Sequence, residues 1–383
     1  YTPVVFFLAL AVALLPYFFV SDYVFSDWLY RALVFLVISC PCALVISVPL
    51  GYFGGIGAAS RHGVLFKGAN YLDLITQVNT IVMDKTGTLT HGVFNVQEVH
   101  AVSGDTEQLL AMAAAIESYS NHPIAKAITG YVKKDSVKPE VSDVKEIPGH
   151  GLEGELNGKI LLAGNNKLLK KYGITYDPAV DAITETNVVI AYDNQYIGYI
   201  TIADEEKEDA SRAIDEMKKL GIQTIVMLSG DKSSITQKLG QKLGLTAAYG
   251  DLLPEEKVQH IERLKENKNN CIAFVGDGIN DAPSLALSDV GIAMGGMGSD
   301  AAIEVADVVI QTDQPSKIAT AIRISKYTRS IVYQNITLAI SIKLLVLSLG
   351  ALGFATMWGA VFADVGVALL AILNSVRVLS KRF

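Results

Sequence analysis

The chain has 383 residues, enough for two or three domains of ordinary size. Half of the residues are hydrophobic and the mean hydropathy is positive, but this average hides a sharp segregation into apolar and polar stretches. The formal net charge of −7, with no basic face, argues against a nucleic-acid partner. Three cysteines are too few for a disulfide framework.

Long apolar runs lie near both ends of the chain. They cover residues 4–20, 33–57, 336–354 and 357–379, and each is long enough to cross a bilayer as a helix, which takes roughly 20 residues. We therefore expect two transmembrane helices in residues 1–62, the second with the motif CPC, and two more in residues 321–383. Basic residues flank the second, third and fourth runs, whereas the loop SDYVFSDW carries only acidic charge. The positive-inside rule then places the polar middle of the chain in the cytoplasm.

The second run contains ISCPCALVIS (38–47), in which a proline separates two cysteines. Pro41 removes a backbone hydrogen bond and frees a carbonyl, which something local must satisfy inside a bilayer. A bound cation is one solution. Because Cys40 and Cys42 would lie on different sides of a regular helix, we expect an unwound segment that turns both sulfur atoms toward one centre. The alternative is a kinked helix with two small apolar cysteines.

Three similar units follow in the polar middle, each with a strand and an acidic, glycine-containing turn. They are NTIVMDKTGTLTHG (79–92), IADEEKEDASRAIDEMKKLGIQTIVMLSGDK (202–232) and NNCIAFVGDGINDAPSLALSDVGIAM (269–294). In a doubly wound parallel sheet such turns converge at the carboxyl ends of the strands. Crowded carboxylates need a divalent cation and a basic side chain, and the set is Asp84, Asp231, Asp277 and Asp281 with Lys257. The alternative for any single turn is a simple helix cap.

The motifs DKTGTLT, SGD and GDGINDAP resemble the phosphorylation-domain signatures of P-type ATPases, which belong to the haloacid dehalogenase-like superfamily. The resemblance implies that Asp84 attacks the γ-phosphate of ATP and becomes an aspartyl phosphate, in a Rossmann-like domain of residues 63–92 and 200–320. It assigns the catalytic site to Asp84, Lys85, Thr86, Ser229, Gly230, Asp231, Lys257, Asn280 and Asp281. Mg²⁺ would bind Asp84, Thr86 and Asp277. Many soluble phosphatases of the superfamily carry an acid where this chain has Thr86, and its absence lets a phosphoenzyme persist.

Residues 93–199 do not repeat the strand and acidic-turn pattern, so we expect an inserted domain there. It contains AAIESYSNHPIAKAI (114–128), PGHGLEG (148–154) and LLAGNNKLL (161–169). A His-Pro pair alone is typical of a turn or a helix entry, but the three stretches together resemble the α+β nucleotide-binding domain of heavy-metal P-type ATPases. The resemblance implies ATP contacts from Glu117, His122, Gly149, Gly151 and Asn165. The glycines would let the backbone approach the ligand closely.

Two isolated charges lie in the last two apolar runs. Lys343 and Asp364 each cost at least about 2.5 kcal/mol at mid-bilayer, so both should face a protein interior and interact. The alternative is a purely structural ion pair. Thiolates alone suit Cu(I), whereas thiolates with a carboxylate suit Zn(II) or Cd(II), and no methionine lies near Asp364. By resemblance to the zinc, cadmium and lead exporters, Cys40, Cys42 and Asp364 would bind the transported ion, with Lys343 as an internal counter-ion.

We therefore expect an α-helical transmembrane bundle with a cytoplasmic α/β portion, whose function is ATP-driven export of Zn²⁺, Cd²⁺ or Pb²⁺ across a bacterial plasma membrane. The alternatives are a Cu(I)-type P-type pump, a membrane-anchored phosphatase, a potassium-related P-type subunit and a metal sensor without catalysis. The sequence contains no TGE-type actuator loop, no earlier membrane helices and no amino-terminal CxxC domain. We expect a fragment whose partners are the lipid bilayer and the actuator domain of the same protein.

Overall fold

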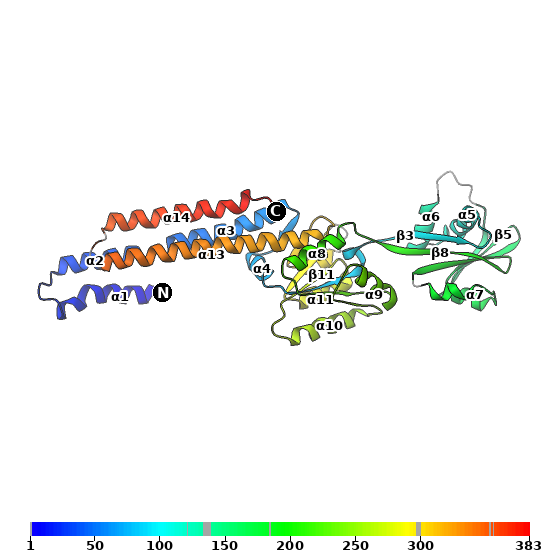
Figure 1. Cartoon of the computed structure of the whole chain (residues 1–383), viewed down its shortest axis with the longest axis horizontal. Helices are drawn as coiled ribbons and strands as arrows, with labels where there is room; N and C mark the ends of the chain where they lie inside the picture. Colours follow the sequence, from blue (N-terminus) through cyan, green and yellow to red (C-terminus); the bar gives the residue numbers. More distant parts are fainter. Residues whose placement is uncertain are drawn as a thin grey trace.

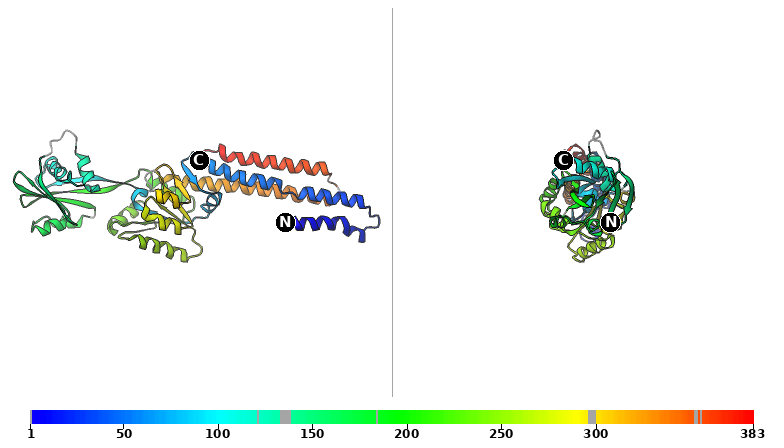
Figure 2. Two further views of the ribbon diagram at one scale, coloured as in Figure 1. Left: turned by 180° about the vertical axis from the view of Figure 1, so that it is seen from behind. Right: turned by 90° about the vertical axis from the view of Figure 1, so that its right-hand side faces the viewer.

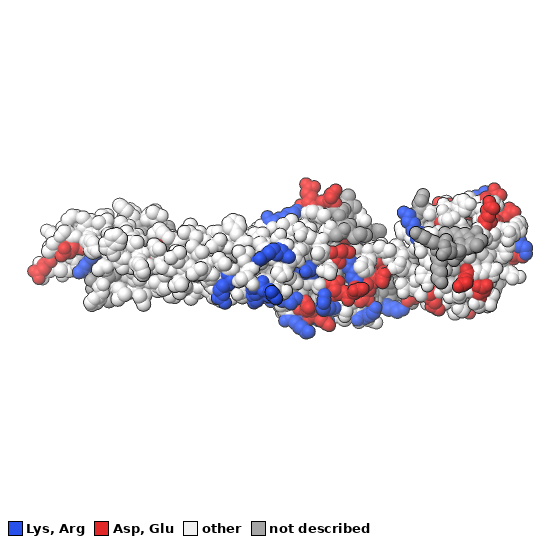
Figure 3. All heavy atoms as spheres, turned by 90° about the horizontal axis from the view of Figure 1, so that it is seen from above, with Lys and Arg blue, Asp and Glu red and all other residues white. Residues whose placement is uncertain are grey.

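The computed structural model describes residues 2–120, 122–132, 139–183, 185–295, 300–351, 354 and 356–383. The molecule is elongated, with a bundle of long helices at one end, a parallel sheet with helices in the middle and an antiparallel sheet at the other end (Figure 1). The views from behind and along the long axis show the three parts in one line (Figure 2). Charged side chains concentrate on the two parts that contain sheets, while the surface of the helical end is mostly uncharged (Figure 3).

The bundle consists of α1 (Thr2–Leu14), α2 (Phe25–Ser39), α3 (Cys42–Arg61), α13 (Ser316–Ala351) and α14 (Met357–Ser380). Within the described residues, three stretches are long and apolar enough to cross a membrane, namely Phe25–Arg61, Ser316–Gly350 and Met357–Ser380. The first apolar run forms a shorter helical stretch than these three. α1 and the 3₁₀ turn that follows it (Leu15–Phe18) cover Thr2–Phe18, a length near the lower limit for a membrane crossing. The loop predicted at residues 21–28 is also shorter, since α2 already begins at Phe25.

The predicted break at the CPC motif is confirmed. α2 ends at Ser39 and α3 begins at Cys42, with Cys40 in an extended conformation between them (φ −63°, ψ 121°). α3 packs against α13 and α14, and a Cβ atom on Gly55 of α3 would lie only 2.6 Å from the Thr328 hydroxyl of α13. Such close packing through small residues is typical of membrane helices. It holds the CPC segment against the two helices that carry the isolated charges.

The middle part contains a seven-stranded sheet in the order β1-β13-β12-β11-β2-β9-β10. Its strands are β1 (Val64–Phe66), β2 (Thr80–Asp84), β9 (Thr224–Leu228), β10 (Ala247–Tyr249), β11 (Ile272–Gly276), β12 (Val290–Met294) and β13 (Val308–Ile310). All neighbouring strands run parallel apart from β1 and β13. Because β11, β2 and β9 are adjacent, the three acidic turns meet at one edge, as the doubly wound pattern predicts.

Helices cover both faces of this sheet. They are α4 (Ala69–Leu74), α8 (Ala210–Lys219), α9 (Ser233–Lys242), α10 (Pro254–Glu266), α11 (Ala282–Leu287) and α12 (Asp300–Val305). One buried apolar core includes α4, α8 and the first turns of α13, and the other includes α10, α11 and α12. α13 therefore belongs to the parallel part at its beginning and to the bundle at its end.

The far part contains a six-stranded antiparallel sheet in the order β3-β8-β7-β6-β5-β4. Its strands are β3 (Thr90–Ala101), β4 (Ser142–Ile147), β5 (Gly151–Leu156), β6 (Lys159–Gly164), β7 (Thr186–Tyr192) and β8 (Gln195–Glu206). Helices α5 (Thr106–Glu117), α6 (Pro123–Tyr131) and α7 (Asn166–Lys171) and the 3₁₀ turn Pro178–Ala182 complete it. β3 and β8 form a long antiparallel ribbon that joins this part to the parallel part (Figure 1).

Regular elements run through the predicted domain boundaries. The boundary predicted at residues 92/93 falls within β3, that at 199/200 within β8 and that at 320/321 within α13. The three parts are thus joined by one long helix and by two long paired strands, whose register shifts between Thr90 and Phe94 and between Val96 and Glu98.

Candidate functional site

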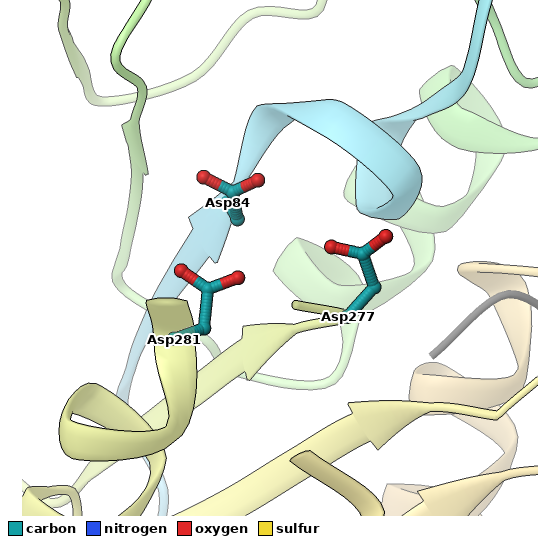
Figure 4. Close-up of side chains that lie close together, drawn as sticks. All are labelled: Asp84, Asp277 and Asp281. Atoms are coloured by element: carbon teal, nitrogen blue, oxygen red, sulfur yellow. The ribbon is translucent and has the colours of Figure 1, made fainter. Parts of the chain in front are cut away.

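Three carboxylates meet at the carboxyl edge of the parallel sheet. Asp84 ends β2, and Asp277 and Asp281 follow β11 (Figure 4). One oxygen atom from each lies within 4.8 Å of the others. Lys257 of α10 donates from Nζ to Asp84 Oδ1 at 2.6 Å and to Asp281 Oδ1 at 3.0 Å. One buried ammonium therefore bridges two of the three carboxylates.

Burial is the main cause of the raised pKa values of the carboxylates in this cluster. Burial raises the pKa of Asp84 to about 7, with the charge of Asp281 acting in the same direction and Lys257 opposing it. Burial and the charge of Asp281 also raise the pKa of Asp277, to about 6. The pKa of Lys257 is raised as well, because the two carboxylates that it contacts outweigh the effect of its burial. An excess of negative charge on oxygen atoms remains, which suits a divalent cation.

The turn after Asp84 has a conformation that requires glycine. Gly87 has φ +72°, and a Cβ atom there would lie 1.6 Å from Asp277 Oδ2. Thr86, just before it, is exposed and has extended backbone angles (φ −75°, ψ 132°). Asn280 is also exposed, on the short helical turn after β11. The backbone thus approaches Asp277 closely, while Thr86 and Asn280 lie at the open side of the cluster.

The turn after β9 contributes Ser229, Gly230 and Asp231. Ser229 is buried, and its hydroxyl oxygen accepts a hydrogen bond from the backbone N–H of Asp231 at 3.1 Å, while Gly230 between them is exposed. Asp231 forms an ion pair with Lys85, whose ammonium also lies 3.8 Å from Asp204. Lys85 therefore connects the turn after β2 to the turn after β9.

Lys207 and Asp204 were not predicted as site residues. Lys207 is 2% exposed, and its Nζ donates to Gly87 O at 2.6 Å and to Asp313 Oδ1 at 2.8 Å. Asp204 accepts a hydrogen bond from the hydroxyl of Thr90, at the start of β3. Both lie in the charged run IADEEKEDA, whose composition is that of a solvated surface, so no local signal distinguishes them. The contacts of these two residues connect the end of β8 to the segment from Gly87 to Thr90, which follows Asp84.

The antiparallel part contains a pocket of about 590 Å³. This volume lies within the roughly 300–1,000 Å³ that is usual for small-molecule sites. The pocket is lined by all five residues that the resemblance assigned to ATP, namely Glu117, His122, Gly149, Gly151 and Asn165. Burial raises the pKa of Glu117 to about 7, so that its carboxyl group titrates near neutral pH.

Three of these residues also shape the pocket. Nδ1 of His122 accepts a hydrogen bond from the backbone N–H of Ile124 at 3.3 Å, which leaves the proton of a neutral ring on Nε2. The side-chain amide of Asn165 donates to Gly149 O at 2.9 Å, and its oxygen caps the first turn of α7. A Cβ atom on Gly151 would lie 2.2 Å from a carbonyl of the adjacent strand β6, so only glycine fits there.

Three of the four residues predicted for the ion site line one small cavity in the bundle. Cys40, Lys343 and Asp364 line it, and Cys42 interacts with both Cys40 and Asp364. The cavity has about 30 Å³, whereas roughly 10–15 Å³ suffices for one water molecule. Among the residues that the structure describes, the ligand atoms of the two cysteines and Asp364 do not all lie within 4.8 Å of one another. The predicted ligands therefore lie near one another, but their ligand atoms do not form a closed coordination sphere.

Lys343 contacts the end of the broken helix. Its Nζ donates to the carbonyl oxygen atoms of Ser39 and Cys40, each at 2.8 Å. The last carbonyls of a helix have no intrahelical donor, and in a bilayer they need another partner. Lys343 and Asp364 share the cavity, but no ion pair joins them in the described part of the chain. The ammonium of Lys343 thus satisfies two carbonyls at the break, while the carbonyl of Val37, four residues before the proline of the CPC motif, accepts from the backbone N–H of Cys40 at 3.3 Å.

Comparisons with known proteins agree with this geometry. The family model of the haloacid dehalogenase-like hydrolases matches residues 78–289. The chain is 54% identical over 380 residues to a zinc-transporting ATPase of Synechocystis sp. and 51% identical over 382 residues to a cadmium, zinc and cobalt-transporting ATPase of Bacillus subtilis. Each alignment covers 99% of this chain but only 52% and 54% of the two relatives, so the chain spans about half the length of the curated relatives it matches.

Solved structures give the same result. The chain resembles a zinc-transporting PIB-type ATPase in the E2·Pi state with a TM-score of 0.90 and 34% identity, over 99% of this chain and 62% of that one. It also resembles the catalytic domain of the CPx-ATPase CopB-B with a TM-score of 0.57 and 32% identity, over 69% of this chain and 96% of that one. The chain therefore belongs to the haloacid dehalogenase-like family and, within it, to the heavy-metal P-type ATPases.

Proposed function

We propose that this chain carries the phosphorylation, nucleotide-binding and ion-binding parts of an ATP-driven exporter of Zn²⁺, Cd²⁺ or Pb²⁺. The observation that carries the proposal is the position of Asp84. This residue ends a central strand, accepts a hydrogen bond from Lys257 and lies beside Asp277. A carboxylate in this setting has the charge partners that phosphoryl transfer requires. Relatives named as zinc-transporting and cadmium-transporting ATPases support the choice of cargo.

Asp84 is the proposed nucleophile. One of its carboxylate oxygens forms a bond to the γ-phosphorus of ATP, and the bond from that phosphorus to the bridging oxygen of ADP breaks. ADP leaves with the electron pair, and Asp84 becomes an aspartyl phosphate. Lys257 stabilises the charge on the transferred group, and the hydroxyls of Thr86 and Ser229 donate to its oxygen atoms.

Asp84, Asp277 and Thr86 are the proposed ligands of Mg²⁺. Carboxylate oxygens suit this ion, and one ammonium among three buried carboxylates leaves the negative charge that a divalent cation balances. When bound, Mg²⁺ supplies charge neutralisation for phosphoryl transfer. Asp281 acts through Lys257, whose ammonium it positions beside Asp84.

The pocket of the antiparallel part is the proposed ATP site. Glu117 and His122 would contact the adenine ring, and the backbone at Gly149 and Gly151 would approach the phosphates. Asn165 acts indirectly, because its side chain already holds Gly149 O and caps α7.

Cys40, Cys42 and Asp364 are the proposed ligands of the transported ion. Two thiolates and one carboxylate suit Zn²⁺, Cd²⁺ and Pb²⁺ better than Cu(I). Lys343 is the proposed internal counter-ion, and its bonds to two carbonyls beside Cys42 give it a fixed position at the cavity.

The chain is an integral membrane protein whose catalytic parts lie on the cytoplasmic side. We propose the bacterial plasma membrane as its location, since the relatives named above are bacterial. The proposed partners are the lipids around the bundle and an actuator domain elsewhere in the full-length protein, which would position water to hydrolyse the aspartyl phosphate.

Acid-stable phosphorylation of the full-length protein from ATP tests the proposal. The label should depend on Zn²⁺, Cd²⁺ or Pb²⁺ and should disappear in Asp84→Asn. Labelling that survives this substitution would mean that another residue is the nucleophile. Stimulation by Cu(I) alone would favour a copper pump, and labelling that ignores every metal would favour a membrane-anchored phosphatase. Cys40→Ala and Cys42→Ala should remove the metal dependence and leave ATP binding intact.

A further inference from the structure

A lysine of the parallel part lines the pocket of the antiparallel part. Lys232 directly follows the SGD turn and precedes α9, yet it belongs to the wall of the 590 Å³ pocket. Every other residue of that wall lies between Glu117 and Val188, within the antiparallel part. Lys232 therefore brings a positive charge to the pocket from the part of the molecule that carries the nucleophile.

The neighbours of Lys232 connect this pocket with the carboxylate cluster. Asp231, the residue before it, pairs with Lys85, which directly follows Asp84. Lys85 and Asp231 also line a second pocket, of about 410 Å³, and Thr186 lines both pockets. The second pocket thus begins beside Lys232, and Lys85 in its wall directly follows Asp84.

Lys232 is available to an anionic ligand. Its side chain is exposed, and no ion pair or side-chain hydrogen bond engages it among the residues that the structure describes. Two other lysines of the same helix are engaged, because Lys238 pairs with Glu185 at 2.5 Å and Lys242 with Glu206 at 2.6 Å. These pairs join α9 to Glu185, just before β7, and to Glu206, at the end of β8.

The charges of the pocket indicate which part of a nucleotide Lys232 contacts. Its carboxylates are Glu117 and Glu146, and its lysines are Lys167 and Lys232. An adenine ring is neutral, whereas a triphosphate carries several negative charges and requires cations. Of the two lysines, Lys232 is the one that lies on the side of the nucleophile. We propose that Lys232 binds the phosphate tail of the nucleotide and directs its terminal phosphate out of the pocket toward Asp84. This inference rests on the proposed ATP-dependent function.

Calorimetric titrations of the full-length protein with adenosine, AMP and ATP, in EDTA so that no phosphoryl transfer occurs, test the inference. Lys232→Ala should weaken ATP binding roughly tenfold, the effect expected for one lost charge-assisted hydrogen bond. Adenosine binding should change less than about twofold, since adenosine has no phosphate to lose the contact. Lys232→Arg should restore most of the ATP affinity, and the difference between wild type and Lys232→Ala should shrink as salt is added.

Lys268→Ala, at an exposed lysine between α10 and β11, is the matched control and should leave all three affinities unchanged. Equal ATP affinity in the wild type and Lys232→Ala would overturn the inference and leave the proposed function standing. Equal weakening of adenosine and ATP would also overturn it, because the lysine would then only maintain the shape of the pocket. A wild-type protein that binds none of the three ligands would instead contradict the proposed function.

Discussion

A lysine ammonium contacts oxygen atoms at both proposed cation sites. Lys257 bridges the carboxylates of Asp84 and Asp281, and Lys343 bridges the carbonyls of Ser39 and Cys40. In each case the lysine partly balances oxygen atoms that have been withdrawn from water. An unpaired buried oxygen costs roughly 1–3 kcal/mol, so each lysine is needed for the surrounding residues to keep their positions.

Glu117→Gln should remove a pH dependence of stability. The pKa of Glu117 is about 7 in the folded protein against an ordinary 4.5, so the folded state holds the proton more tightly than the unfolded chain. Its contribution is fully present below pH 4.5 and is lost as the pH rises through 7. The loss amounts to about 3 kcal/mol. Hydrogen exchange of α5, compared at pH 5 and pH 8 after correction for the intrinsic rates, measures this effect.

The variant Glu107→Gln provides the control for Glu117→Gln. Glu107 is an exposed acid on the same helix and should leave the pH profile of α5 unchanged. Identical pH profiles for the wild type and Glu117→Gln would show that the carboxyl is already ionised at pH 5.

Gly87→Ala should abolish phosphorylation while the fold persists. The new methyl group would collide with Asp277, and displacements of about 1 Å at a reacting site commonly cost roughly 100-fold in rate. The initial rate of phosphoenzyme formation should therefore fall at least about 100-fold. Gly104→Ala is a matched control, because Gly104 also has a positive φ (+82°) but has nothing within 4 Å of the added atom. Similar rates in the two variants would mean that backbone strain, and not contact with Asp277, determines the effect.

The break between α2 and α3 should depend on Lys343. Lys343→Met keeps the length of the side chain but leaves two carbonyls without a donor, which should lower stability by about 2 kcal/mol. Lys343→Gln retains N–H donors and should therefore lose less stability than Lys343→Met. Thermal unfolding in lipid nanodiscs without added metal measures both variants. Ser348→Ala on the same helix, where the hydroxyl bonds only to its own helix, should behave as wild type. A Lys343→Met protein as stable as wild type would contradict this account.

The elements that could be predicted from the sequence are those with local signals. β2, β9 and β11 are short, mainly apolar strands that end in or lead into a turn with glycine and aspartate, and Pro41 stands where the helix is interrupted. Three of the four predicted carboxylates, Asp84, Asp277 and Asp281, meet as these signals predict, because parallel strands place their carboxyl ends at one edge, whereas Asp231 pairs with Lys85.

Other contacts could not be predicted, because they depend on tertiary structure. Lys207 lies in a charged run and Lys232 directly follows the SGD turn, and only the folded chain places one beside the Gly87 turn and the other at a pocket of a different part. The partners of Lys343 are likewise far away in the sequence. The sequence motifs indicate no strands at residues 90–101 and 195–206, where β3 and β8 extend beyond the inserted sheet into the ribbon.

At the scale of the whole molecule, the two sheet-containing parts should unfold separately. The antiparallel part has apolar cores of its own and is joined to the parallel part through the β3–β8 ribbon. A non-hydrolysable ATP analogue at 100 times its dissociation constant should stabilise the antiparallel part by about 2.7 kcal/mol and the parallel part by less, about 1.4 kcal/mol, because only Lys232 of the parallel part contacts the nucleotide. Hydrogen exchange along a urea series, with each sheet followed separately, measures this difference. A single transition that moves as a whole would show that the two parts are one cooperative unit.

The parallel part is connected to the bundle by helices and not by a two-stranded ribbon. α13 begins in the core of the parallel part, at Ile318 and Ile322, and continues without interruption to Lys343 at the cavity. α3 begins at the CPC motif and is followed by β1 of the same sheet. A rotation of the parallel sheet therefore moves the walls of the ion cavity that α3 and α13 form, whereas Asp364 lies on α14.

The irregular pairing of β3 with β8 has a mechanical consequence. The register shifts between Thr90 and Phe94 and again between Val96 and Glu98, and such bulges are where a two-stranded ribbon bends and twists. The antiparallel part would therefore swing about this point as a lever, and its pocket would travel farther than the pivot itself. Since Thr90 lies three residues beyond Gly87, each swing also turns the loop beside Asp277. The same movement would then both deliver the nucleotide and align the nucleophile.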